Sequence, residues 1–318
     1  MGNDACVYIS KKQYTRKTVE ELLYMMDYKK FGDVFYCGND EEYKYFSGVR
    51  VYKCDDTKEK MVYHIRTQIY CSGYDLKKQN DTIRCFKKYC NAWFISDLGK
   101  NRFFEAKRLI KGAESGCFFA IQNLDNNFAF LEGSLERFPE DYENEKKLMG
   151  LTGLPSPDVF NANVYLSYLC SLLEEYFRST YIALLKYSDR KEKVLNTKFS
   201  PQDLADISEG KETVEEVFSR TLSFQNIEKV VSNFKTLDSK LDIGKPLKEP
   251  YKRRKETLYE QINSIFERRH RMIHRIEIDI NYTSKKLKKD INDIKVALKR
   301  VYIYICNQYG WEVEEVYI

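Results

Sequence analysis

Two histidines in an arginine-rich segment are the residues of this chain best suited to acid–base chemistry. The chain has 318 residues and three histidines, and two of these, His270 and His274, lie within Arg268–Arg275 (RRHRMIHR). Imidazole exchanges protons near neutral pH, and the fixed positive charge of arginine suits it to bind phosphate. Cleavage of a phosphodiester needs a base, an acid and a cation that stabilises the charged transition state. The segment therefore contains the side chains for all three roles.

The segment from Lys255 to about Ile280 has the apolar periodicity of a helix. At 100° per residue, the apolar side chains gather on one face, with Arg269 near its centre. These side chains are Ile262, Ile265, Phe266, Ile273, Ile276 and Ile280. Because the guanidinium cannot lose its charge, burial of Arg269 requires a carboxylate, a phosphate or a water-filled cavity. His270 and His274 lie one turn apart on the flank of the same face.

Three interpretations of this helix compete. Two histidines at this spacing also occur in zinc-binding HExxH helices, but here no carboxylate lies between them and the surrounding arginines would repel a divalent cation. A purely structural interpretation pairs Arg269 with a glutamate of the core and leaves both histidines on the surface. The third interpretation is metal-free cleavage of RNA through its own 2′-OH.

Two segments resemble the HEPN superfamily. Arg269–His274 (RHRMIH) matches its motif of an arginine, a polar residue, three variable residues and a histidine. Ser167–Leu185 (SYLCSLLEEYFRSTYIALL) is similar to the first helix of HEPN domains of the ribonuclease and abortive-infection type, where a glutamate is followed shortly by an aromatic residue and an arginine. The resemblance covers about residues 160 to 310 and implies a bundle of helices.

The resemblance also implies a function and site residues. It implies an endoribonuclease that needs no metal or cofactor and acts as a homodimer, with the motifs of two copies forming one composite site. Arg269 would orient and stabilise the scissile phosphate, His274 would be the main acid or base, and His270 would support the site or share the proton transfer. Glu174 or Glu175 would hold Arg269, and Glu175 fits the family pattern slightly better. The remaining arginines of the segment would contact RNA: Arg268, Arg271 and Arg275.

A toxin or antiviral-defence setting follows from the same resemblance. The N-terminal domain would then sense a trigger or hold the nuclease inactive, and an antitoxin or a phage-derived trigger would be a partner. The alternative is a non-catalytic HEPN module that binds nucleotides or a partner protein.

Charge is concentrated near the candidate site. Between Lys245 and Arg300 there are 17 Lys and Arg against 8 Asp and Glu, whereas the whole chain has a formal net charge of only +5. A basic stripe along a helical hairpin is the footprint of a phosphate-backbone ligand, although a charge run is also typical of a solvated face.

The chain as a whole predicts a two-domain α+β protein. Residues 1 to 150 indicate a mixed α/β or β-rich domain, the glycine- and proline-rich segment 151 to 158 a linker, and residues 159 to 318 an all-α bundle. The predicted strand-like runs are Lys44–Cys54, Met61–Cys71, Trp93–Ser96, Cys117–Gln122 and Phe128–Leu131, with a helix over Thr18–Tyr28. The later helices are predicted over Asn163–Lys186, Thr213–Leu237, Lys255 to about Ile280, and Ser284–Gln308.

Other side chains support cytoplasmic localisation and structural roles. The nine cysteines form no CxxC pair, which favours a reducing compartment, and a zinc site of Cys54, Cys71, Cys85 and Cys90 would lack the usual short spacing. No apolar stretch is long enough to span a membrane. His64 is expected to be half-buried in a sheet, and Trp93 to belong to a core rather than to stack on bases.

Overall fold

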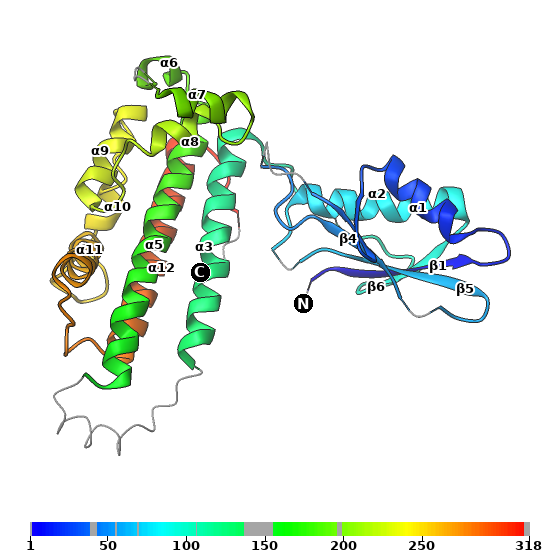
Figure 1. Cartoon of the computed structure of the whole chain (residues 1–318), viewed down its shortest axis with the longest axis horizontal. Helices are drawn as coiled ribbons and strands as arrows, with labels where there is room; N and C mark the ends of the chain where they lie inside the picture. Colours follow the sequence, from blue (N-terminus) through cyan, green and yellow to red (C-terminus); the bar gives the residue numbers. More distant parts are fainter. Residues whose placement is uncertain are drawn as a thin grey trace. The chain divides into compact units, whose positions relative to one another are not determined.

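The computed structural model describes residues 2–38, 43–54, 56–68, 70–105, 107–136, 155–195 and 199–314. The chain divides into two compact units, Met1–Ser115 and Gly116–Ile318. The first is built on a seven-stranded antiparallel sheet, and the second is helical (Figure 1). The predicted order, a mixed N-terminal domain followed by an all-helical region, is confirmed.

The sheet of the N-terminal unit has the strand order β2-β3-β4-β5-β1-β6-β7, and each neighbouring pair is antiparallel. Cys6 of β1 lies opposite His64 of β5 and opposite Ile95 of β6. The strands are β1 (Asp4–Ser10), β2 (Lys29–Phe31), β3 (Val34–Cys37), β4 (Val49–Lys53), β5 (Lys60–Arg66), β6 (Trp93–Ser96) and β7 (Gly99–Lys100).

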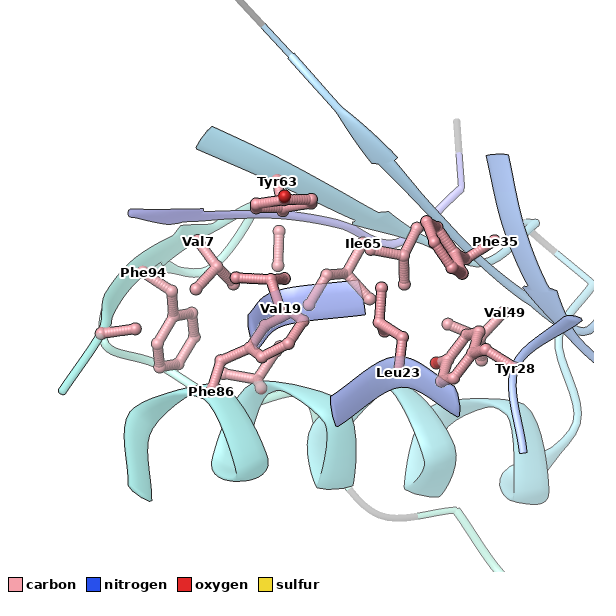
Figure 2. Close-up of a cluster of buried hydrophobic side chains, with 14 of the residues drawn as sticks. Val7, Val19, Leu23, Tyr28, Phe35, Val49, Tyr63, Ile65, Phe86 and Phe94 are labelled. Atoms are coloured by element: carbon pink, nitrogen blue, oxygen red, sulfur yellow. The ribbon is translucent and has the colours of Figure 1, made fainter. Parts of the chain in front are cut away.

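Helices α1 (Arg16–Met25) and α2 (Gly73–Cys90) lie on the same side of this sheet (Figure 1). Alternate residues of β1 are buried, as expected of a strand with one covered face. Between the helices and the sheet lies the core, where Val19 and Leu23 of α1 and Phe86 of α2 meet Val7 and Ile65 (Figure 2). This inner face of the sheet, towards α1 and α2, is thus the apolar one.

The C-terminal unit is arranged around the long helix α5, which contacts α8, α9, α11 and α12. Because α5 is packed on several sides, its buried residues are not confined to a single stripe. Its helices are α3 (Gly112–Glu136, which begins in the first unit), α5 (Pro157–Lys186), α6 (Lys191–Val194), α7 (Pro201–Ser208), α8 (Val214–Ser219), α9 (Ile227–Leu237), α10 (Lys245–Lys248), α11 (Leu258–Arg275) and α12 (Ser284–Tyr309).

Two predicted strands are wrong, because Cys117–Gln122 and Phe128–Leu131 both lie in α3. The apolar residues of this segment recur at helical spacing and are buried: Cys117, Ile121, Leu124, Phe128, Leu131 and Leu135. Glu132 of α3 pairs with Lys295 of α12 at 2.8 Å. The chain therefore divides at Ser115, whereas the sequence analysis assigned residues 1 to 150 to the first domain.

Some predicted helix boundaries also differ. The segment Thr213–Leu237 forms two helices rather than one, because Asn226 caps the start of α9 and accepts a hydrogen bond from the Lys229 backbone N–H at 3.1 Å. Helix α11 ends at Arg275, not near Ile280. Of the predicted linker, residues 151 to 154 lie outside the described residues, and α5 already begins at Pro157. The elements without a counterpart among the predicted strands and helices include β1, β2, β7 and α2.

Candidate active site

Packing of α11 on α5 brings the motif arginine to a glutamate. Thr257 and Glu260 form a capping box that begins α11, and Ile262, Ile265 and Phe266 are buried. The Cys170 thiol of α5 donates to the Ile265 carbonyl oxygen at 3.8 Å. One turn further along each helix, Arg269 faces Glu174. The helix contact thus determines which side chain Arg269 meets.

Arg269 is held by two side chains. Its Nη2 lies 4.0 Å from Glu174 Oε1, and its Nη1 donates to Gln225 Oε1 at 3.5 Å. Gln225, between α8 and α9, in turn donates from Nε2 to Glu174 Oε2 at 3.2 Å. Sequence reasoning missed Gln225, because a glutamine between two helices has no periodicity or motif that marks it.

These contacts do not satisfy every hydrogen-bonding atom of the Arg269–Glu174 pair. Arg269 Nε and Glu174 Oε1 are both buried and have no hydrogen-bond partner among the described residues. A paired guanidinium commonly makes two parallel hydrogen bonds to a carboxylate, and here the two groups only approach each other. Arg269 is therefore positioned by Glu174 and Gln225 in an open contact, and one of its donors has no partner among the described residues.

Glu175, the slightly favoured partner of Arg269 in the sequence analysis, lies elsewhere. Its carboxylate pairs with Arg178 at 3.2 Å and accepts a hydrogen bond from Ser179 Oγ at 2.6 Å, on the exposed side of α5. That preference was wrong, because adjacent positions of a helix point about 100° apart and only Glu174 points towards α11.

His270 and His274 lie side by side on the surface of α11. Both are exposed, and their ring centroids are 4.4 Å apart with an interplanar angle of 46°. Their spacing of one helical turn is the local cause of this contact. In the part of the chain that the structure describes, no three His, Cys, Asp or Glu side chains gather in a group that could hold a metal ion.

The other arginines of the segment fall into two groups. Arg268 is mostly buried, with Nε 3.1 Å from Asp279 Oδ2 and Nη1 3.7 Å from Asp290 Oδ2, and its guanidinium lies over the Tyr282 ring. This geometry gives Arg268 a structural role, so the candidate site does not include it. Arg271 and Arg275 are exposed and are free to contact a ligand.

The predicted apolar face of α11 is buried only over its first half. Ile273 is 49% exposed, Ile276 86% and Ile280 71%. Ile276 directly follows the last residue of α11 and has a left-handed backbone with φ 56°. Such a conformation is rare for a β-branched residue. An apolar group next to the two histidines is therefore left on the surface.

Part of the basic hairpin is used inside the unit. Arg254 donates to Asp293 of α12, and Arg300 donates to the backbone oxygens of Glu249 and Pro250. In contrast, the first turn of α12 contains no acidic residue. Its first two turns contain four lysines: Lys285, Lys286, Lys288 and Lys289. Cations at a helix N-terminus oppose the helix dipole, so this end of α12 favours an anionic partner.

Comparison with protein-family models, with curated proteins and with solved structures finds no match for this chain. The resemblance to HEPN domains therefore depends on residues of α5 and α11 alone. No described helix is both long enough and apolar enough to cross a membrane.

Proposed function

We propose that this protein is a metal-independent endoribonuclease whose site lies on α11. The observation that carries the proposal is the arrangement on one helix of two exposed, adjacent imidazoles and an incompletely satisfied guanidinium, those of His270, His274 and Arg269. Together these groups supply acid–base chemistry and phosphate binding in the absence of a bound ion.

The proposed reaction is attack of the RNA 2′-OH on the adjacent phosphorus. The imidazole of His274 takes the hydroxyl proton as a base, and a protonated histidine on the other side of the phosphate gives a proton to the departing 5′ oxygen, with His270 in support. The 2′-oxygen–phosphorus bond forms and the phosphorus–5′-oxygen bond breaks, which leaves a 2′,3′-cyclic phosphate. Arg269 stabilises the negative charge that develops on the phosphate oxygens.

A second copy of the chain would complete this site. In-line displacement places the attacking and leaving oxygens on opposite sides of phosphorus, whereas His270 and His274 project from the same stretch of one helix. A two-fold axis beside α11 would bring a second pair of imidazoles to the other side. The exposed Ile273, Ile276 and Ile280 are the apolar contact that such a dimer would bury.

The charge around the site supports RNA as the substrate. Arg271 and Arg275 are exposed beside the histidines, and the lysines at the start of α12 add an uncompensated positive end. Phosphate contacts of this kind supply affinity without sequence specificity. A toxin or antiviral-defence setting in the cytoplasm, with the N-terminal unit regulating cleavage and an antitoxin or phage-derived trigger as partner, remains part of the proposal.

The test is digestion of labelled RNA by full-length wild type, His274→Ala and Lys229→Ala in the presence of EDTA. Lys229→Ala is the control, because it removes an exposed cation from α9 outside the site. We expect wild type and the control to release 2′,3′-cyclic phosphate ends and His274→Ala to be at least 100-fold slower, in line with the typical contribution of acid–base catalysis, roughly 100- to 10,000-fold. Loss of wild-type cleavage in EDTA, or full activity of His274→Ala, would contradict the mechanism.

Self-association is tested on the same proteins. We expect sedimentation velocity to show that the wild type is a dimer. The double variant Ile273→Ser with Ile280→Ser should be a monomer and should lose cleavage in parallel. Both isoleucines are exposed, so replacing them with serine leaves the buried half of α11 unchanged. A monomeric wild type that cleaves at full rate would exclude the composite site.

A further inference from the structure

The second face of the N-terminal sheet is unlike the apolar inner face. We call it the outer face, and it consists of the strand side chains that point away from α1 and α2. The register of the strands assigns these positions. Five are aromatic (Tyr8, Phe31, Tyr36, Tyr52 and Trp93), five are cationic (Lys29, Arg50, Lys60, Arg66 and Lys100), and one is acidic (Asp4).

Aromatic rings and cations are combined at one end of the outer face. Tyr8 of β1 and Trp93 of β6 are cross-strand partners, and their rings are stacked with centroids 4.1 Å apart and 5° between planes. The ammonium groups of Lys60 and Lys100 lie 4.8 Å and 5.2 Å from the Trp93 ring centroid. Both rings are only partly buried, so the expectation that Trp93 belongs to a core was wrong.

Like charges meet at the other end of the outer face. Arg50 of β4 lies directly opposite Arg66 of β5, and like charges at opposed positions destabilise a sheet. Arg66 Nε is 3.4 Å from Asp4 Oδ1, which His64 Nε2 also approaches to 2.8 Å. Arg50 is exposed and has no ion-pair partner among the described residues. Arg66 is thus paired with Asp4, whereas an anionic ligand would supply the partner that Arg50 lacks among the described residues.

The length of the outer face limits what the ligand can be. Arg66 and Lys60 are six residues apart on β5, which corresponds to about 20 Å at the usual rise of a strand. A mononucleotide cannot reach both cationic ends, whereas a polymer can. Neither α1 nor α2 covers this face (Figure 1), and a sheet face that carries aromatic rings and cations is the kind on which unpaired bases stack while phosphates bind alongside.

We propose that the outer face of the N-terminal sheet binds single-stranded RNA. The bases stack on the aromatic side chains around Tyr8 and Trp93, and the backbone phosphates contact Arg50, Arg66, Lys60 and Lys100. The inference depends on the sheet alone and is independent of the proposed cleavage at α11.

The test is binding of a fluorescein-labelled 12-nucleotide oligouridine to the full chain, followed by fluorescence anisotropy as a function of salt. All proteins contain His274→Ala, so that the probe is not cleaved during the measurement. Binding is thereby tested separately from the nuclease proposal. The variants are Arg50→Gln with Arg66→Gln, and Trp93→Leu. Their matched controls are Arg16→Gln with Arg84→Gln, on the two helices of the same unit, and Trp311→Leu in the other unit.

We expect the double arginine variant to bind at least 10-fold more weakly, with a salt slope smaller by about 1.4, since each phosphate contact to a single strand contributes roughly 0.7. Trp93→Leu should weaken binding about 5- to 150-fold, the usual contribution of one stacked base. Both controls should bind as the His274→Ala parent does. Circular dichroism checks that each variant folds. If Trp93→Leu does not fold, the double arginine variant still tests the proposal, because both of its substitutions are at exposed positions.

Three results would overturn the proposal. The first is equal affinity of the parent and the double arginine variant for the oligouridine. The second is a duplex RNA of the same length that binds as tightly, because paired bases cannot stack on the rings. The third is binding of anionic phosphatidylserine vesicles, but not of oligouridine, in an Arg50- and Arg66-dependent way, which would identify a membrane surface instead.

Discussion

Glu174 on α5 and Arg269 on α11 face each other, with Oε1 4.0 Å from Nη2, and Gln225 donates to the same carboxylate while it accepts from the same guanidinium. The geometry is that of a positioning contact rather than a closed ion pair, because buried polar atoms of both residues lack partners among the described residues. A closed bidentate pair would consume the donors that a phosphate needs. The open pair keeps Arg269 oriented and available.

Glu174 and Glu175 should therefore differ sharply when neutralised. Glu174→Gln removes the carboxylate that faces a mostly buried guanidinium and should lower the free energy of unfolding by about 1 to 3 kcal/mol. Glu175→Gln affects only a surface contact with Arg178 and should cost less than about 1 kcal/mol. Urea denaturation measures both, and equal effects would mean that Arg269 does not depend on Glu174.

Arg268 and Arg271 provide a second contrast on neighbouring positions of α11. Arg268→Met leaves the buried carboxylate of Asp290 and that of Asp279 without their cation and should destabilise the unit by about 3 kcal/mol. Arg271 is exposed, so Arg271→Met should leave the melting temperature unchanged and instead weaken RNA binding at low salt. A thermally neutral Arg268→Met would disprove the structural role assigned to Arg268.

Asp293 should make stability depend on acid pH. Burial alone would raise the pKa of this carboxyl, but hydrogen bonds from Arg254 and Gln261 outweigh burial and lower it. A lowered pKa in the folded state contributes stability above the usual aspartate value and loses it as pH falls through the lowered one. Asp293→Asn should therefore cost about 1 to 3 kcal/mol at pH 7.

The same comparison at low pH provides the control. The difference in unfolding free energy between wild type and Asp293→Asn should begin to shrink as the pH falls below about 4, where the carboxyl of the unfolded state takes up a proton, and should be smallest below the lowered pKa of the folded state, where the carboxyl is neutral in both states. A difference that stays constant from pH 7 to pH 3 would show that the loss is one of packing.

Cys170 should make stability depend on alkaline pH. Burial raises the pKa of its thiol to about 12. A raised pKa favours the neutral thiol in the folded state, so this stabilisation is complete below the ordinary value of 9.0 and is lost as pH rises towards 12. We expect Cys170→Ala to flatten the alkaline limb of the stability curve.

Alkylation checks the same point chemically. At pH 8.5, iodoacetamide should label Cys170 of the native protein far more slowly than that of the protein unfolded in urea, because only the thiolate reacts. Peptide mapping by mass spectrometry measures both rates. Equal rates would show that the α5–α11 contact opens readily in the native state.

The local features of the site were readable from the sequence. The spacing of Ile262, Ile265 and Phe266 predicts α11. His270 and His274 are close because they are one turn apart on that helix. The strand Trp93–Ser96 was likewise predicted to its bounds. In each case, neighbours in the chain are sufficient to decide the structure.

Predictions failed where a distant segment decides the outcome. The helical spacing of α3 is present in the sequence, but its several phenylalanines favoured a prediction of strands. A contact with α12, distant in the chain, forms in the helix that the segment adopts. The outer half of the apolar stripe on α11 was expected to be buried, and Ile273 and Ile276 are exposed because no described helix of the unit covers them.

By itself the sequence determined the order of a mixed and a helical region, the helix of the motif and the pairing of its histidines, because these depend on propensity and on contacts within one turn. Only the tertiary structure decided that Glu174 rather than Glu175 faces Arg269, that Gln225 joins them, and that Arg268 is structural. The reason is geometric. These choices depend on the rotation of α5 against α11 and on the path of segments outside α11, such as the one that holds Gln225, 44 residues from Arg269, and no local pattern encodes them.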